Sequence, residues 1–351
     1  MTLSVSVVST ARILPRPAQN ARATWSHRQS CIITLKSDSG NRGQGEAAPL
    51  PAFSPDNLTD CQQALAALDL RELPARLEPG QDLIGELGRA SVRIPPNLPA
   101  ARAALEAALL DLWSRAASVP AWALLAPGAP TPRQRALAAL LTGEPERAVE
   151  QALAARARGV TTFKFKIGRP GALARELSAV RALRAELGAS ARLRLDANQA
   201  LSVAEAREYL PRFAALDVEF IEEPCAPTEL AQLDDLALPL ALDESLATGA
   251  HPRRGDRAII AKPAVQGGIT GCYALGEAAR AVGASLVLSH AFEGPLGLAL
   301  SAVLALCIGS DTVAHGLDCE GAQLDPLALP AYRNGTIHTW SEPGFGISEQ
   351  P

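Results

Sequence analysis

From about residue 136 onward, short apolar segments with strand character alternate with longer helical segments. Regular alternation of this kind indicates a parallel sheet. The number of units favours a closed (β/α)8 TIM barrel over an open doubly wound sheet, and no GxGxxG follows an early strand to support a dinucleotide-binding fold. We expect helices over 145–158, 171–187 and 202–216, and strands over 136–141, 161–166, 192–196, 218–222, 239–243, 258–262 and 285–289.

The part before this alternation has the pattern of a smaller α+β module. Residues 3–8 and 30–36 are rich in β-branched residues and predict strands, whereas 14–25, with two prolines, predicts a long loop. Further on come turn residues at 37–45, helical patterns at 57–68 and 82–90, a proline-rich break at 94–99 and a strong helix over 100–117. We therefore expect three parts: the α+β capping module over 1–95, the barrel over 96–315, and a tail, 316–351, that returns to the module.

Composition and charge argue against several classes of function. The formal net charge is −4 without any block of like charges, so we expect neither nucleic acid nor a membrane as a partner. None of the six cysteines forms a CxxC pair, which argues for reduced thiols rather than a zinc site or disulfides. No leader-like segment and no stretch of about 18 uncharged apolar residues is present, so a cytoplasmic protein is expected. The oligomeric state does not follow from the sequence.

Five ionisable residues stand where successive apolar strands end: Lys166, Asp196, Glu222, Asp243 and Lys262. Their spacings are 30, 26, 21 and 19 residues, each close to one strand–helix repeat. Consecutive strands of a barrel deliver such residues to the same carboxyl-terminal rim, where the active sites of this fold lie. Each residue alone has an ordinary alternative, such as a solvated strand face for a lysine or a helix cap for a carboxylate. Their appearance in order is what favours a functional site.

The three carboxylates among these residues predict a metal ion. Acidic side chains that converge at a barrel rim repel one another unless a cation lies between them. Hard oxygen ligands select Mg²⁺, with Mn²⁺ as a substitute. A lysine beside that cation can act as a base, because the metal and partial burial both lower its pKa. The pattern therefore predicts a small carboxylate substrate, bound to the metal and flanked by Lys166 and Lys262.

These motifs together resemble the enolase superfamily, in its muconate-lactonizing branch. The resemblance spans nearly the whole chain and is carried by GQGEAAPLP at 43–51, ARAALEAALLDLW at 101–113, FKFKIG at 163–168, LRLDANQ at 193–199, FIEEP at 220–224, LALDES at 240–245 and AKPAVQGG at 261–268. It implies that Asp196, Glu222 and Asp243 bind Mg²⁺, which stabilises the enediolate formed when a base removes the substrate α-proton. It also implies Lys166 as the acid/base and Lys262 on the opposite face of the substrate.

The resemblance assigns supporting roles as well. Lys164 is expected to lower the pKa of Lys166 and to contact the substrate carboxylate. Glu223 and Glu244 are expected to orient ligands or lysines from behind. Segments 14–25 and 49–56 are expected to form a lid over the barrel mouth. Further substrate contacts are expected, with His290 as an additional candidate, at Arg194, Asn198, Ser289 and Glu293.

Within the branch, KFKIG, LRLDANQALS, SHAFEGPLG at 289–297 and PGFGI at 343–347 are similar to the o-succinylbenzoate synthase family of menaquinone biosynthesis. That similarity implies a syn dehydration in which Lys166 is first base and then acid, while Lys262 stabilises negative charge. N-succinylamino-acid racemases and dipeptide epimerases stay open as alternatives, because two lysines also suit a 1,1-proton transfer. Dipeptide epimerases typically carry a DxD motif, from which Asp318-Cys319-Glu320 departs. A non-catalytic relative would lack a ligand or a lysine, and none is missing.

Overall fold

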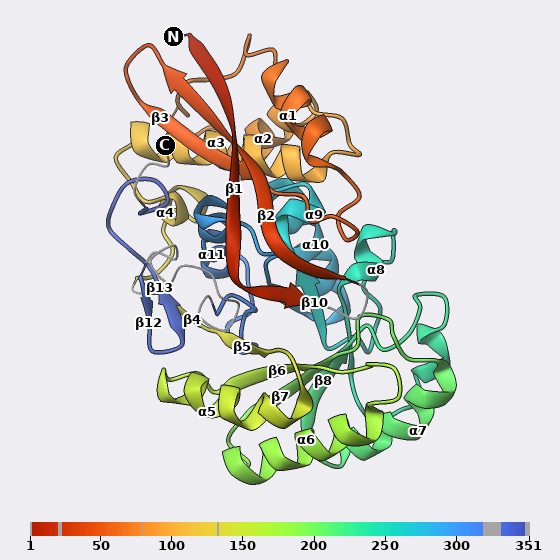
Figure 1. Ribbon diagram of the computed structural model, residues 1–351. Helices are drawn as coiled ribbons and strands as arrows, with labels where there is room; N and C mark the ends of the chain where they lie inside the picture. Colours follow the sequence, from red (N-terminus) through yellow and green to blue (C-terminus); the bar gives the residue numbers. More distant parts are fainter. Residues whose placement is uncertain (1, 20–22, 79, 132, 319–330, 348–351) are drawn as a thin grey trace.

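The computed structural model describes residues 2–19, 23–78, 80–131, 133–318 and 331–347. An antiparallel N-terminal module with helices lies above a curved parallel sheet that is surrounded by further helices (Figure 1). The predicted mixed α/β fold, a barrel-type sheet beside a separate α+β module, is confirmed. None of the described helices is long and apolar enough to cross a bilayer.

The sheet of the module has the order β1-β2-β3 and consists of β1 Leu3–Gln19, β2 Thr24–Ser37 and β3 Arg42–Ala47. The loop predicted over 14–25 is wrong, because both strands extend into this segment and still pair, with Ala18 opposite Trp25. The two prolines of the segment fall in a register shift between Ile13 and Ala18, where the ladder needs no N–H from them. The paired strands therefore form an arm that reaches down toward the barrel (Figure 1).

The first three helices agree with the predicted positions: α1 Leu58–Ala66, α2 Leu83–Ser91 and α3 Pro99–Ala116. Helix α3 is buried on nearly all sides and packs directly on β3. Two glycines allow this approach: a Cβ at Gly45 would lie 1.9 Å from the Ala104 carbonyl oxygen, and one at Gly43 would lie 2.2 Å from that of Ala108. Only a residue without a side chain fits between strand and helix at these positions.

Seven parallel strands form the barrel sheet, in the order β5 to β11. They are β5 Ala138–Leu141, β6 Thr162–Lys166, β7 Arg192–Asp196, β8 Val218–Glu222, β9 Leu240–Leu242, β10 Ala258–Ala261 and β11 Ser285–Leu288. Each lies within a predicted strand segment, which confirms those segments. The helices of this part are α4 Ala121–Leu125, α5 Ala148–Ala157, α6 Leu173–Leu187, α7 Val203–Ala214, α8 Glu244–Ala247, α9 Pro263–Gln266, α10 Ile269–Val282 and α11 Pro295–Cys307, with 3-10 turns at Pro145–Arg147 and Leu230–Leu233.

The segment around His315 closes the ring between the first and last strands of this sheet. It pairs with each neighbour through an isolated bridge, Leu137 with His315 and Ser289 with Gly316. The Ala138 N–H donates to the His315 carbonyl at 2.7 Å, and the Gly316 N–H donates to the Leu288 carbonyl at 2.9 Å. The eighth position of the predicted barrel is thus taken by a bridged segment rather than by a full strand.

The tail adds a small sheet of its own, in the order β12-β13-β4, from β12 Tyr332–Arg333, β13 Thr336–His338 and β4 Gln134–Ala136. The predicted strand 136–141 is therefore split, because the Leu137 N–H donates to Gly335 of the tail. Farther along, the Phe345 N–H donates to Asp111 of α3, which also accepts from the Gln44 N–H of β3. One buried carboxylate thereby joins the tail to the module.

Candidate active site

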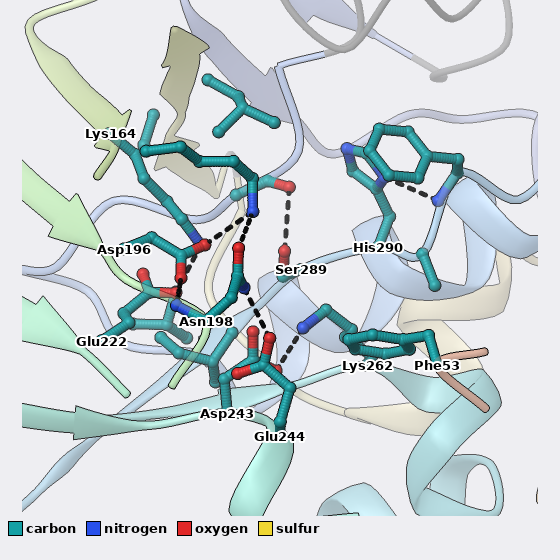
Figure 2. Close-up of a pocket in the computed structure, with 18 of the residues that line it drawn as sticks. Phe53, Lys164, Asp196, Asn198, Glu222, Asp243, Glu244, Lys262, Ser289 and His290 are labelled. Carbon is teal, nitrogen blue, oxygen red and sulfur yellow. Dashed lines mark hydrogen bonds and ion pairs between the residues drawn. The ribbon is translucent and has the colours of Figure 1, made fainter. Parts of the chain in front are cut away.

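The carboxyl-terminal ends of β6 to β10 carry the charged residues around one pocket. Asp196 stands in register with Lys166 on one side and with Glu222 on the other. Asp243 directly follows β9, and Lys262 directly follows β10. All five residues line the same pocket, so the structure brings together the set that the strand spacing predicts (Figure 2).

Two lysines of β6 share the Asp196 carboxylate. Lys164 Nζ lies 2.9 Å from Asp196 Oδ2 and also pairs with Glu222. Lys166 Nζ lies 3.0 Å from the same Asp196 oxygen and donates to Asn198 Oδ1 at 2.6 Å. Burial acts to lower the pKa of Lys164, but Asp196 and Glu222 outweigh it and hold that pKa above its usual value. Lys164 is therefore an ammonium that offsets the charge of two carboxylates.

Lys262 is the buried lysine of the site. Its ammonium pairs with the Asp243 carboxylate and lies 4.8 Å from the centre of the Phe53 ring (Figure 2). Phe53 belongs to the segment that follows β3, so the module contributes this contact. An ammonium held between a carboxylate and an aromatic face is stabilised in its charged form.

Electrostatics make the carboxylates interdependent. Burial raises the pKa of Glu222 to about 7; Lys164 opposes this rise, and the charges of Asp196 and Asp243 add to it. Burial likewise acts to raise the pKa of Asp196, but Lys164 and Lys166 bring it below its usual range. Burial, with Asp243 and Asp196, raises the pKa of Glu244 to about 8. The pocket therefore holds more negative charge than its lysines fully offset.

The donor set fits a divalent cation. Asp196, Glu222 and Asp243 are buried oxygen ligands at the ends of three neighbouring strands, which is the donor chemistry that Mg²⁺ prefers. Within the described ranges, no three acidic, histidine or cysteine side chains are already grouped as a metal site. Lysine ammoniums pair with these carboxylates instead. A divalent cation among the carboxylates would take over this charge compensation and release the lysines toward a substrate.

Glu223, Glu244 and Asn198 differ in how they support this centre. Glu223 lies behind it and accepts from the Asp243 N–H at 2.7 Å and from the Ser245 hydroxyl at 2.5 Å. Glu244 lies in the pocket lining itself, beyond the supporting position predicted for it. Asn198 connects Lys166 with Glu244, because its side chain accepts a hydrogen bond from Lys166 and donates one to Glu244 at 2.5 Å. The backbone of Asp243 is thus fixed by Glu223.

Four of the five predicted substrate contacts lie in the lining: Lys164, Arg194, Asn198 and Ser289. Ser289 lines the pocket and donates to the Gly316 carbonyl at 3.4 Å. Arg194 lies deeper in the barrel, 2.6 Å from Glu219, with a second donor 2.6 Å from the Ala314 carbonyl. Its Nη2 is buried and has no hydrogen-bond partner in the described structure. Arg194 therefore keeps one buried donor without a partner among the described residues, and its guanidinium lies 4.7 Å from the centre of the Phe220 ring.

Glu293 is the predicted substrate contact that the structure does not bring to the pocket lining. It is buried, and its carboxylate accepts from the Ala291 N–H at 2.6 Å. Phe292, between these two residues, has a φ of 59°. The Glu293 carboxylate therefore stabilises the turn that contains Phe292.

The sequence did not predict that aromatic residues form one wall of the pocket. Trp25, Phe53, His290 and Phe292 line the pocket, with the Trp25 and Phe292 rings 6.4 Å apart and the His290 and Phe292 rings 5.3 Å apart. Burial, and then Lys262 and Lys164, lower the pKa of His290 to about 3, so this wall is uncharged at neutral pH. Trp25 and Phe53 lie in the expected lid segments and His290 was a candidate contact, but the sequence does not show which way their rings point.

Of the motif Asp318-Cys319-Glu320, only Asp318 is among the described residues. It lines the pocket, but its carboxylate lies 3.0 Å from Arg158 and accepts from the Tyr332 hydroxyl at 3.0 Å. An arginine outside the lining therefore offsets the charge of Asp318.

A parallel barrel with lysines and carboxylates at its strand ends, and an α+β module beside its mouth, defines an enolase-type barrel enzyme. Residues 2–126 match the mandelate racemase / muconate lactonizing enzyme N-terminal domain family, and residues 147–350 match the enolase C-terminal domain-like family. The chain belongs to the enolase superfamily, as the sequence motifs predict.

Its relatives include enzymes with different reactions. The L-Ala-D/L-Glu epimerase of Bacillus subtilis is 27% identical over 97% of this chain and 95% of its own length. The o-succinylbenzoate synthase of Thermosynechococcus vestitus is 30% identical over 69% of this chain and 68% of its own. The structure of a dipeptide epimerase from Methylococcus capsulatus, complexed with Mg and the dipeptide L-Arg-D-Lys, superposes with a TM-score of 0.80 over 99% of both chains at 24% identity. Identity alone therefore does not choose the reaction.

Proposed function

We propose that the protein is an o-succinylbenzoate synthase. In this reaction 2-succinyl-6-hydroxy-2,4-cyclohexadiene-1-carboxylate loses water in the syn sense and becomes 2-succinylbenzoate, a step of menaquinone biosynthesis. The observation that carries the proposal is the unequal setting of the two lysines. Lys262 is buried between Asp243 and the Phe53 ring, whereas Lys166 faces Asn198 and Asp196.

Asp196, Glu222 and Asp243 would hold Mg²⁺, or Mn²⁺ in its place. When bound, the cation supplies positive charge that stabilises the negative charge developing on the substrate carboxylate. Mg²⁺ is bound in a related dipeptide epimerase structure, which supports this choice.

The proton transfers fall to Lys166. As a neutral amine it takes the α-proton, so the C–H bond breaks and Lys166 becomes an ammonium. Lys166 then returns that proton to the departing hydroxyl on the same face, the C–O bond breaks and water leaves. Lys262 stays an ammonium throughout, because the face of the Phe53 ring, whose centre lies 4.8 Å from its Nζ, stabilises the charged form. It therefore acts on the developing negative charge without exchanging a proton.

A second candidate is the racemisation or epimerisation of an amino-acid derivative by both lysines. The relationship to the Bacillus subtilis epimerase over nearly the whole chain favours it. The pairing of Asp318 with Arg158 speaks against a substrate with a free ammonium, because the carboxylate that could bind it is already offset. This candidate therefore includes dipeptides and N-acylated amino acids, and the Asp318–Arg158 pair favours the N-acylated ones, such as N-succinyl derivatives.

The test uses purified protein with saturating Mg²⁺. Dehydration of the cyclohexadiene substrate is followed by absorbance, and parallel reactions follow the optical rotation of N-succinyl amino acids and of dipeptides. Dehydration supports the proposal, and its absence under saturating metal refutes it. Racemisation without dehydration would establish the second candidate instead.

A further inference from the structure

Arg28 of β2 is a buried guanidinium whose described hydrogen bonds all go to backbone carbonyl groups. Its Nη2 donates to the Ala48 oxygen at 2.6 Å and its Nη1 to the Pro49 oxygen at 3.1 Å. Its Nε donates to the Phe292 oxygen at 3.1 Å. The three carbonyls belong to two segments more than 200 residues apart in the sequence. Arg28 therefore ties together two backbone segments that otherwise belong to different parts of the fold.

Both segments supply the outer wall of the pocket. Leu50 and Phe53 follow the first pair of carbonyls, and His290 and Phe292 belong to the second segment. Phe292 has a φ of 59°, a left-handed conformation that a bulky residue adopts only where its surroundings enforce it. The Phe292 carbonyl is the one that Arg28 holds, so this contact stabilises the unusual turn.

Arg12 of β1 reinforces the same turn. It donates to the Phe292 carbonyl and, at 2.6 Å, to the Glu293 carbonyl. Burial lowers the pKa of Arg28, while the nearby charges of Glu293 and Glu46 act to raise it. Glu46 in turn accepts from the Gly294 N–H at 2.9 Å, at the start of α11. Two arginines and two glutamates, of which only Arg12 is partly exposed, thus connect the arm of the module to the turn after β11.

We propose that Arg28, assisted by Arg12, is a positioning residue that fixes the aromatic wall and thereby sets substrate affinity. Neither guanidinium is among the groups lining the pocket, so both act through the wall and not on the reacting atoms. A guanidinium presents five N–H donors in a flat fork and can serve three carbonyls at once, which the single ammonium of lysine cannot do in that geometry. The Arg28→Lys enzyme keeps the charge but loses the fork. This inference depends on the proposed function only because the kinetic test uses the substrate of that function.

The kinetic test compares Arg28→Lys with wild type in the dehydration assay. We expect KM to rise at least about tenfold while kcat stays within about threefold, because only binding to the wall is weakened. The shift of the thermal midpoint by Mg²⁺ should remain, because the carboxylates are untouched. The matched control is Arg102→Lys: Arg102 donates twice to the Ile94 carbonyl, at 3.0 and 2.9 Å, and does not line the pocket. Its KM should stay at the wild-type value.

A second measurement does not depend on turnover. Amide hydrogen exchange of residues 289–297 should be faster in Arg28→Lys and in Arg12→Gln, but unchanged in Arg102→Lys. Arg12 is only partly buried, so its variant serves if Arg28→Lys does not fold. Wild-type KM and wild-type exchange in the Arg28 and Arg12 variants would overturn the proposal, as would a fall in kcat at constant KM. A wild-type protein without dehydratase activity would refute the proposed function alone, and the exchange experiment would still decide this inference.

Discussion

His315 gives the barrel closure a dependence on pH that can be measured. Its Nδ1 accepts from the Leu288 N–H at 2.9 Å, and its Nε2 lies 3.1 Å from the Ser310 carbonyl. Both nitrogens are thus engaged with the ring in its neutral form. Burial, opposed in part by the Ser310 carbonyl, lowers the pKa of His315 to about 3. The imidazole therefore resists protonation only while the barrel stays folded.

The magnitude follows from the two pKa values. In the unfolded chain the imidazole has a pKa of about 6.5, so between that value and about 3 the unfolded state binds more protons than the folded state. Stability from this group is fully present above the unfolded pKa and is lost as pH falls. At pH 5 the free energy of unfolding should be lower by about 2 kcal/mol than at pH 8 through His315 alone.

The assay is equilibrium unfolding in urea at pH 8 and pH 5 for wild type and for His315→Gln. Glutamine can accept from the Leu288 N–H and donate to the Ser310 carbonyl, but it does not titrate in this range. The other titrating groups are common to both proteins and cancel in the difference. We expect the advantage of wild type over the variant to shrink by about 2 kcal/mol between pH 8 and pH 5. Parallel pH dependences would refute the assignment of His315 as a ring that stays neutral in the fold.

Three further outcomes test the site and the packing. Lys166→Ala should lower the kcat of dehydration by about three orders of magnitude or more. Lys262→Arg keeps a cation that cannot act as a base, so it should retain far more activity than Lys262→Met. Equal losses of activity in the two Lys262 variants would contradict a purely electrostatic role. Chelation of divalent cations should abolish activity, and Mg²⁺ at about 100 times its Kd should stabilise wild type by about 2.7 kcal/mol but not Asp243→Asn, as measured by thermal unfolding. Gly45→Ala should cost about 1–3 kcal/mol or more by overpacking against α3, measured by urea unfolding, while Gly88→Ala, where a Cβ meets nothing within 4 Å, should be neutral or slightly stabilising.

The charged centre could be predicted from the sequence because its geometry is repetitive. Parallel strands place their carboxyl ends on one rim, so a residue at each strand end, spaced by one repeat, must meet its counterparts. Asp196 and Glu222 are indeed in register on adjacent strands. Six of the seven predicted barrel strands were right for the same reason, because short apolar runs between helices leave little choice of position; only the segment 136–141 is divided between two sheets.

The pocket wall could not be predicted in this way because backbone contacts between distant segments determine it. Arg28 reaches the Phe292 carbonyl across 264 residues, and a sequence gives no sign of which carbonyl an arginine will meet. Glu293, for which the resemblance implied a substrate contact, lies outside the pocket lining, and its carboxylate accepts from the Ala291 N–H instead. The prolines of 14–25 led to the wrong prediction of a loop. A register shift in the pairing of β1 with β2 allows the edge strand β1 to continue past them.

The surroundings of the two lysines differ because of a residue outside the barrel. The barrel repeat alone places Lys166 and Lys262 as equivalent partners around the carboxylates, an arrangement that suits racemisation as well as dehydration. The two lysines differ because the Phe53 ring, which belongs to the module, lies against Lys262. Phe53 stands four residues after Pro49, whose carbonyl Arg28 holds. The module therefore contributes both to the pocket wall and to the surroundings of one of the two lysines.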